Sequence, residues 1–288
     1  MRNYKERVTP QKIVFLDIDG TLMGADGIVP PSALTACREA RRQGHLLYIC
    51  SGRPRSIISD AVLAIGFDGI ISSGGARIET GGAVIFDTVM PAETVKQITA
   101  YLHNLQCGFS FETNNSVLSN RYFLNHWETL KRNFAGMPQA NVVDDLLSRM
   151  SKDVLPEDPS DFSYVGVNKI VFVGSPGVSF EALSKTFAGV CELFHGSIPF
   201  SGKEGGEIGP LGVHKGSAVK RIAEHYGIPL ADTIAFGDSD NDRTMIEAVG
   251  IGIAMGNADD ALKEIADDVT ASLKEDGLFK GFKKYGLI

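Results

Sequence analysis

The sequence predicts an α/β protein, a doubly wound parallel sheet interrupted by an inserted α+β module. Short apolar runs alternate with helix-like segments up to residue 76 and again from residue 215, as they do where crossover helices join parallel strands. Between these stretches the alternation is lost, and most aromatic residues lie there. We therefore expect one discontinuous core domain, residues 1–87 and 208–288, with a separate domain at 88–207.

The predicted core strands are short and apolar and end on polar residues, as strands buried in a parallel sheet do. They lie at residues 13–16, 46–50, 69–72, 233–236 and 250–254. Pro at the start and Gly at the end of a segment favour helices between these strands. The expected helices lie at 32–43, from Pro54 onward, from Lys215 to the residue before Gly227, and at 243–248. Glycines between 76–79 and 83–87 indicate a β-hairpin.

The inserted module is predicted to mix helices and strands. Residues 91–105 form a helix, because their apolar side chains fall on one helical face. Short strands and further helices follow at 109–111, 121–134, 169–173 and 180–187. The aromatic residues here are expected to form the core of the module rather than a substrate-binding cluster. They are Phe109, Phe111, Tyr122, Phe123 and Trp127.

Composition narrows the functional class. The formal net charge of −7 argues against a nucleic-acid or anionic-membrane binder, although a local basic pocket can still hold a small anion. The four cysteines form no CxxC pair, which indicates free thiols in a reducing compartment. The polar N-terminus does not fit a signal peptide, and no apolar stretch reaches the length of a membrane span. The expected location is the cytoplasm.

Chemically distinctive residues follow three of the predicted strands. Residues 17–21 read DIDGT, residues 51–53 read SGR, and residues 237–242 read GDSDND. In open α/β sheets ligands bind beyond the carboxyl ends of the strands. These segments are therefore expected to share one pocket with Lys215, which stands at the start of a predicted helix. A lysine there opposes the helix dipole, which favours a functional reason for its position.

The residue types in this pocket suit phosphate chemistry with a metal ion. Clustered carboxylates repel, and an all-oxygen ligand set suits a hard cation such as Mg²⁺. Backbone N–H groups of Gly20 and Thr21, together with Lys215, would stabilise an anion. A carboxylate is also a nucleophile for phosphoryl transfer through an aspartyl-phosphate.

The motifs DIDGTL, ICSGRP, HKGSAV and GDSDND, in this order, resemble the four motifs of the haloacid dehalogenase-like superfamily. The insertion between the second and third motifs resembles the α+β cap (type IIB) of Cof-type sugar-phosphate phosphatases. The resemblance implies a Rossmann-like core, a phosphatase activity and Mg²⁺ as cofactor. The implied substrate is a small phosphorylated metabolite, with no nucleic-acid or membrane partner, and the protein is expected to be a monomer or a small homo-oligomer.

The resemblance also implies individual roles. Asp17 attacks phosphorus, and Asp19 protonates the leaving oxygen and then deprotonates the hydrolytic water. Mg²⁺ is held by the carboxylates of Asp17 and Asp238 and the backbone carbonyl of Asp19, and Asp242 orients Lys215 or a metal-bound water. The phosphate-binding set completes the site: Gly20, Thr21, Ser51, Gly52, Arg53, Lys215 and Asn241.

Several residues near the motifs have two interpretations. Arg53 contacts substrate or forms a surface ion pair, and His214 has no role that the mechanism requires. Asp240 is expected to be only an N-terminal helix acid. Residues 73–76 read SGGA where many Cof-type proteins have an Asn-Gly-Ala turn, which puts the role of that asparagine in doubt here. The Gly-rich segment 202–209 serves as a hinge or reaches the active site.

Two other functions compete with the phosphatase. A sugar phosphomutase shares the aspartyl-phosphate but returns the phosphoryl group to sugar. A non-catalytic phospho-acceptor or sugar-phosphate sensor uses the same sheet, but needs neither a large insertion nor Asp19. A dehalogenase is disfavoured, because its chemistry needs no acid at Asp19.

Overall fold

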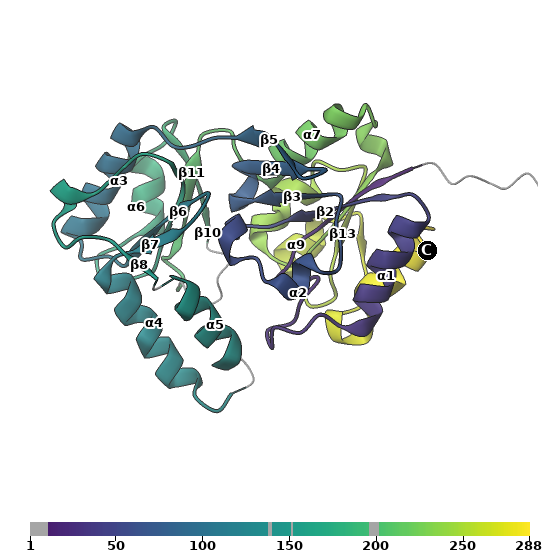
Figure 1. The fold of residues 1–288 in the computed structure, drawn as a ribbon, viewed down its shortest axis with the longest axis horizontal. Coiled ribbons are helices and arrows are strands. Elements are labelled where there is room, and N and C mark those ends of the chain that lie inside the picture. The colour runs from purple at the N-terminus through teal and green to yellow at the C-terminus, as the bar shows by residue number, and fades with distance from the viewer. Residues whose placement is uncertain (1–10, 138–139, 151, 196–201) are drawn as a thin grey trace, which may run out of the picture.

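The computed structural model describes residues 11–137, 140–150, 152–195 and 202–288. Two lobes lie side by side, each built around one β-sheet (Figure 1). All strands from Phe109 to Pro210 belong to the smaller sheet, and the strands before and after them form the larger one. The core sheet is therefore assembled from two separate chain segments, as the sequence predicts.

The larger sheet has the strand order β14-β13-β12-β1-β2-β3-β4-β5. Its parallel part contains β1 (Ile13–Leu16), β2 (Leu46–Cys50), β3 (Gly69–Ser72), β12 (Thr233–Gly237), β13 (Ile251–Ala254) and β14 (Asp268–Val269). The predicted hairpin, β4 (Arg77–Thr80) and β5 (Ala83–Asp87), adds two antiparallel strands at one edge. Strand β1 lies centrally, between β12 and β2, so the loops after these strands come together at one edge.

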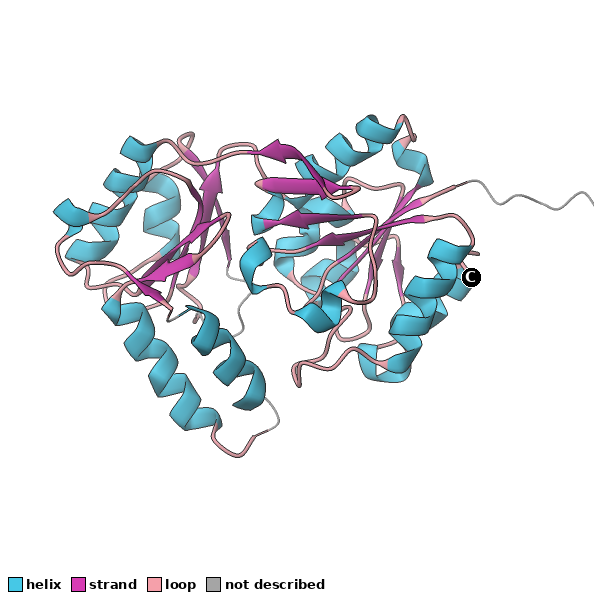
Figure 2. Cartoon of the chain, viewed as in Figure 1, coloured by secondary structure: helices cyan, strands magenta, loops and turns pink. Residues whose placement is uncertain are grey.

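Helices cover both faces of this sheet (Figure 2). They are α1 (Pro31–Arg42), α2 (Asp60–Leu63), α7 (Lys215–Tyr226), α8 (Arg243–Ile246), α9 (Asp260–Ile265) and α10 (Gly277–Lys284). Successive strand residues face opposite sides, so Val14 and Leu16 belong to the apolar core beneath α1 and α10, whereas Ile13 and Phe15 belong to the core beneath α7. The doubly wound fold class is confirmed.

The smaller sheet has the order β10-β11-β9-β6-β7-β8. Its strands are β6 (Phe109–Thr113), β7 (Val117–Ser119), β8 (Asp153–Val154), β9 (Val167–Phe172), β10 (Cys191–His195) and β11 (Gly206–Pro210). Its helices are α3 (Ala92–Asn104), α4 (Arg121–Phe134), α5 (Ala140–Met150) and α6 (Phe180–Thr186). The apolar faces of α3 and α6 pack on one side of the sheet. Of the predicted core aromatics, Tyr122 alone is exposed; the other four are buried.

Short 3₁₀ turns complete the fold and account for one difference from the sequence analysis. They are η1 (Arg55–Ile57), η2 (Ser73–Gly75), η3 (Pro159–Asp161), η4 (Leu230–Asp232), η5 (Asp240–Asp242) and η6 (Leu273–Glu275). The helix expected from Pro54 is split into η1 and the one-turn α2, because the chain is extended at Ile58 and Ser59. The predicted domain boundaries stay a prediction, and β11 runs across the second of them.

Within the described ranges, no helix combines the length and the apolar character needed to cross a membrane.

Candidate active site

The loop after β1 is a tight turn that presents Asp17 and Asp19. The Asp17 N–H donates to the Phe236 carbonyl of β12 (3.1 Å), and the N–H groups of Leu22 and Met23 both donate to Ile18. The Gly20 N–H donates to the Met23 carbonyl (2.8 Å). The turn thus uses the Gly20 N–H, and the binding of phosphate by this donor stays a prediction.

Gly20 is required at its position by close packing. Its φ is +80°, and an added Cβ would lie 2.0 Å from Oδ2 of Asp238. The neighbouring Thr21 hydroxyl donates to Oδ1 of the same carboxylate (3.1 Å). The carbonyl of Gly20 in turn accepts from the Asn257 amide (2.9 Å), a contact that no sequence motif indicated. The loop thus holds Asp238 in place beside Asp17.

The substitution Gly20→Ala is expected to remove most activity and to lower the melting temperature. The new methyl group would displace the Asp238 carboxylate, and the left-handed φ is unfavourable for alanine. Thermal unfolding and steady-state kinetics of this variant test the expectation. Gly82→Ala is the matched control, since Gly82 also has a positive φ but no neighbour within 4 Å. Equal effects of both substitutions would contradict the packing explanation.

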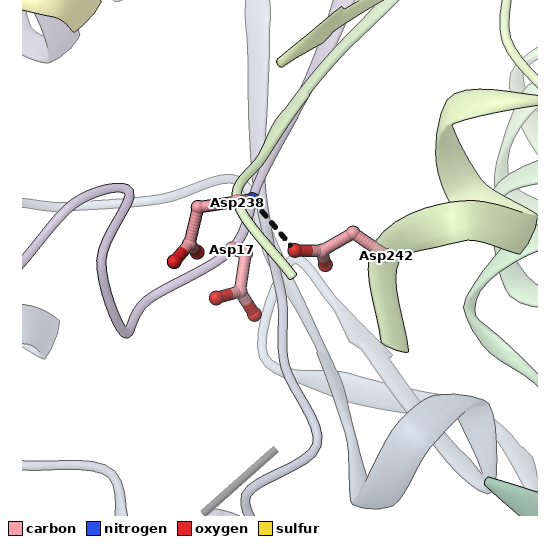
Figure 3. Close-up of side chains that lie close together, drawn as sticks. All are labelled: Asp17, Asp238 and Asp242. Atoms are coloured by element: carbon pink, nitrogen blue, oxygen red, sulfur yellow. Dashed lines mark hydrogen bonds between the residues drawn. The ribbon is translucent and has the colours of Figure 1, made fainter. Parts of the chain in front are cut away.

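Three carboxylates converge at the strand ends: Asp17, Asp238 and Asp242 (Figure 3). Each offers an oxygen within 4.8 Å of those of the others. Asp242 is fully engaged, since its Oδ1 accepts from Lys215 (2.6 Å) and its Oδ2 accepts from the N–H groups of Asp238 and Ser239 (2.9 and 3.3 Å). These bonds suit the predicted role of orienting Lys215. A direct role of Asp242 in metal binding stays a prediction.

Lys215 lies buried between Asp17 and Asp242. Its Nζ donates to Oδ1 of Asp17 (2.7 Å) and to Oδ1 of Asp242 (2.6 Å). His214 caps helix α7 through its Nδ1, which accepts from the Ser217 N–H, and so fixes the start of the helix that carries Lys215. Burial opposes the charge on Lys215, but the two carboxylates outweigh it and raise the pKa well above its usual value. Lys215 is therefore charged throughout the accessible pH range.

The remaining carboxylates carry more negative charge than Lys215 neutralises. Burial, reinforced by Asp242, raises the pKa of Asp17 to about 7. Burial and the neighbouring Asp17 raise the pKa of Asp238 to about 8. An ionised pair at these positions is stabilised by a cation. The oxygen-only donor set and the excess negative charge fit a hard divalent cation such as Mg²⁺.

The loop after β2 brings Ser51 and Arg53 to the same edge. Ser51 is buried, and its hydroxyl accepts from the Arg53 N–H (3.2 Å). The Arg53 guanidinium binds both carboxylate oxygens of Asp19, at 2.8 and 2.7 Å. Of the two interpretations of Arg53, the structure shows an ion pair. Its partner is Asp19, inside the candidate site rather than at the surface.

The SGGA sequence after β3 still supports the loop after β2. The Ser73 N–H donates to the Arg53 carbonyl (2.9 Å) and the Gly74 N–H to the Ser51 carbonyl (3.0 Å). Ser73 has a φ of +49°, a left-handed conformation in which asparagine is enriched. The absent asparagine therefore leaves the turn intact, with a less favourable residue at its strained position.

A pocket that is partly open to solvent lies between the lobes. The larger lobe contributes Gly52, Lys215, Asn241, His214 and the turn at Ser73 and Gly74, and the smaller lobe contributes Lys169, Phe194 and Glu207. The segment 202–209 therefore reaches the active site. Sequence reasoning missed Lys169 and Phe194. The signal for Lys169 was a single lysine within the apolar strand β9.

Comparison with known proteins assigns the family. A family model described as haloacid dehalogenase-like hydrolase matches residues 14–282. The 5-amino-6-(5-phospho-D-ribitylamino)uracil phosphatase YitU of Bacillus subtilis (strain 168) is 30% identical, over 96% of this chain and 98% of that protein. The solved structure of the HAD subclass IIB sugar phosphatase BT4131 matches with a TM-score of 0.78 at 28% identity, over 96% of this chain and 100% of the other.

A haloacid dehalogenase-like hydrolase from B. subtilis also matches, with a TM-score of 0.81 at 25% identity, over 95% of this chain and 99% of the other. These matches extend through both lobes, and the motifs that suggested the family lie together at the edge of the core sheet. The chain therefore belongs to the haloacid dehalogenase-like hydrolases, as a Cof-type phosphatase with a subclass IIB cap.

Proposed function

We propose that the protein is a Mg²⁺-dependent phosphatase that hydrolyses monoesters of small phosphorylated metabolites through an aspartyl-phosphate on Asp17. The observation that carries this proposal is the buried Asp17 carboxylate, held by Lys215 beside Asp238, with Asp19 two residues away in the same turn. A nucleophile, a charge-stabilising group and a separate acid and base are thereby available at one edge of the core sheet.

Each residue has a distinct part in the proposed reaction. Asp17 forms the bond to phosphorus while the ester oxygen leaves, and Asp19 gives that oxygen a proton. Asp19 then removes a proton from the water that releases phosphate. Among the described residues Lys215 has two hydrogen-bond partners, so its third N–H can bind a phosphoryl oxygen. We assign Ser51 and Asn241 to the same proposed phosphate site.

The proposed metal site uses Asp17, Asp238 and the backbone carbonyl of Asp19. When bound there, Mg²⁺ supplies charge that stabilises the phosphoryl oxygens. Thr21 holds the Asp238 carboxylate in position for this role through its hydroxyl. We propose a cytoplasmic location and a monomeric or small homo-oligomeric state on the sequence features given above.

The proposed substrate is a small metabolite. Support comes from the pocket between the lobes and from the names of two similar proteins, which act on a sugar phosphate and on a phosphorylated ribitylaminouracil. A panel of sugar phosphates, nucleotides and p-nitrophenyl phosphate, assayed for phosphate release with Mg²⁺ and with EDTA, tests the proposal. We expect release from small monoesters only with Mg²⁺. Isomerised sugar phosphate without net release would instead show a phosphomutase.

Mg²⁺ binding is expected to weaken as the pH falls from about 8 to about 6. Mg²⁺ needs ionised carboxylates, and in the metal-free protein the pKa of Asp17 is about 7 and that of Asp238 about 8. Both values lie above those of the unfolded chain, so the native state holds extra protons. Without metal, the contribution of these two carboxyl groups to stability is therefore full below about pH 4 and is lost as the pH rises through about 7 to 8.

Thermal unfolding at pH 6 and pH 8, with Mg²⁺ or with EDTA, measures this linkage. Mg²⁺ should raise the melting temperature clearly at pH 8 and much less at pH 6. An equal rise at both pH values would contradict metal binding at this carboxylate pair.

A further inference from the structure

The cap sheet carries a buried cluster of charged residues on the face that does not pack against α3 and α6. Lys169 of β9 lies between Glu207 of β11 and Glu112 of β6, with Nζ–Oε2 distances of 2.7 and 3.2 Å. All three side chains are at most 5% exposed. Their neighbours Phe111, Ile170 and Ile208 face the apolar core on the other side, so strand alternation directs the charges to the opposite face.

Lys169 also joins the cap to the catalytic domain. Its Nζ donates to the backbone carbonyl of Gly52 (2.5 Å), in the loop between Ser51 and Arg53. Two of the three N–H donors of its ammonium group are used by the Gly52 carbonyl and by Glu207, and Glu112 is an ion-pair partner at 3.2 Å. An incoming anion would therefore compete with two carboxylates for the charge of Lys169.

The cluster holds two carboxylates and one ammonium group. Burial, followed by the repulsion from Glu207, raises the pKa of Glu112 to about 7 in spite of Lys169. The same two carboxylates outweigh burial and raise the pKa of Lys169. The cluster therefore carries one excess negative charge at the cap side of the pocket only when the pH lies above about 7, and this charge is screened weakly because the cluster is buried.

The described pocket lining as a whole offers no positive charge that is not already paired with carboxylates. Lys169 and Lys215 are the only lysines or arginines among its described lining residues, and each is already paired with two carboxylates. Burial lowers the pKa of His214, which therefore stays neutral near pH 7. Beyond the phosphate site, the lining thus offers hydrogen-bond acceptors and the ring of Phe194, but no unpaired cation.

On the basis of the proposed function, we propose that this cluster selects the leaving group by charge. The pocket takes phosphate monoesters whose remote end is a neutral polyol or a cationic amine, and it rejects esters that carry a second anion. Glu207, which lines the pocket, and Glu112, which adds the excess charge behind it, are the specificity determinants. A second phosphate or a carboxylate would face Glu207 without a free cation, whereas hydroxyl and ammonium groups would donate to it.

A matched series of open-chain hexitol 6-phosphates tests this selection. Its three members differ only in the terminal group that contains carbon 1, which is CH₂OH, CH₂NH₃⁺ or COO⁻. At pH 8 with Mg²⁺, where Glu112 is mostly ionised, we expect kcat/KM for the carboxylate to lie at least about tenfold below that for the alcohol, as a like charge at close range in a weakly polar pocket predicts. The amine should equal or exceed the alcohol. A carboxylate turned over as fast as the alcohol would overturn the inference.

Variants assign the effect to the cluster. Glu207→Gln and Glu112→Gln should each reduce the alcohol-to-carboxylate ratio at least about threefold, because each removes one negative charge. Glu204→Gln is the control, since this exposed residue removes the same charge from the neighbouring loop, where it accepts from the Phe180 N–H. The ratio is taken within one preparation, so a partly unfolded variant does not change it. Unchanged ratios in both cluster variants would overturn the assignment.

Hydrolysis of p-nitrophenyl phosphate separates this inference from the proposed function. If the protein releases phosphate from this ester but shows no preference in the hexitol series, the charge selection is wrong and the phosphatase stands. If no ester in either set is hydrolysed, the proposed function is overturned, and the inference with it.

Discussion

Replacing Asp17 with asparagine is expected to reduce phosphate release by at least about 10⁴-fold, because the amide cannot form the aspartyl-phosphate. The fold should survive this change. Asp17 is buried with a pKa raised to about 7, so at pH 8 its charge opposes folding in the metal-free protein. The melting temperature of Asp17→Asn in EDTA at pH 8 should therefore equal or exceed that of the unmodified protein.

Steady-state kinetics and thermal unfolding check both parts of this prediction. Asp240→Asn is the matched control, because Asp240 belongs to the GDSDND motif but is exposed, and among the described residues its carboxylate pairs with Arg243 at the surface. This control should keep its activity. Turnover in Asp17→Asn at the level of the control would contradict the assignment of the nucleophile.

Replacing Asp19 with asparagine is expected to slow turnover by about 10²- to 10⁴-fold while leaving the nucleophile in place. The backbone carbonyl proposed to bind Mg²⁺ remains in this variant. The reaction should therefore depend on the leaving group. An alkyl phosphate needs a proton on its departing oxygen, whereas p-nitrophenolate leaves without one. With p-nitrophenyl phosphate, Asp19→Asn should release one equivalent of nitrophenolate rapidly and then turn over slowly.

Rapid-mixing kinetics measure this burst. Asp26→Asn, in the same loop, is the control, since Asp26 is exposed and its carboxylate accepts only from the Ile28 N–H. Equal slowing of nitrophenyl and alkyl esters, with no burst, would count against Asp19 as the acid and base. The resting Arg53–Asp19 ion pair adds a condition: Arg53 must release Asp19, or share it, before the carboxyl group can be protonated.

The convergence of the strand-end motifs was predictable, because it follows from the order of strands and helices along the chain. A short apolar strand followed by DIDGT, and another followed by GDSDND, place carboxylates at one edge of any parallel sheet. The structure brings Asp17 and Asp238 together there, with Lys215 between Asp17 and Asp242. The helix bounds at 121–134 and 215–226 were also correct, because Asn120 caps the start of the first helix, and His214 caps the start of the second, which Gly227 ends.

Other features depend on packing that a motif does not encode. The Gly20 N–H is used by a turn closed at Met23, and only the folded loop shows that donor to be engaged. Arg53 could equally have pointed to solvent, and its contact with Asp19 depends on how the two loops meet. Lys169 contacts Glu112 and Glu207 because β9 lies between β6 and β11 in the smaller sheet. The sequence does not reveal this strand order, because the three residues are far apart in the chain.

These contacts give the two lobes complementary charge arrangements. In the core, Lys215 neutralises only part of the charge of the neighbouring carboxylates, and the remaining charge on Asp17 and Asp238 is available to a metal ion. In the cap, Lys169 leaves an excess of negative charge that no residue lining the described pocket neutralises. Each lobe thus places one lysine between two carboxylates. In the core this arrangement suits phosphate binding, and in the cap it suits a leaving group that carries no further negative charge.

The central claim is that Asp17 carries the phosphoryl group during turnover. Its most direct test is mass spectrometry of Asp19→Asn, mixed with p-nitrophenyl phosphate and Mg²⁺, quenched in acid and digested. The account predicts one added phosphoryl group on the peptide that contains Asp17, lost when EDTA replaces Mg²⁺. A phosphoryl group on any other residue, or phosphate release with Asp17 never modified, would contradict it.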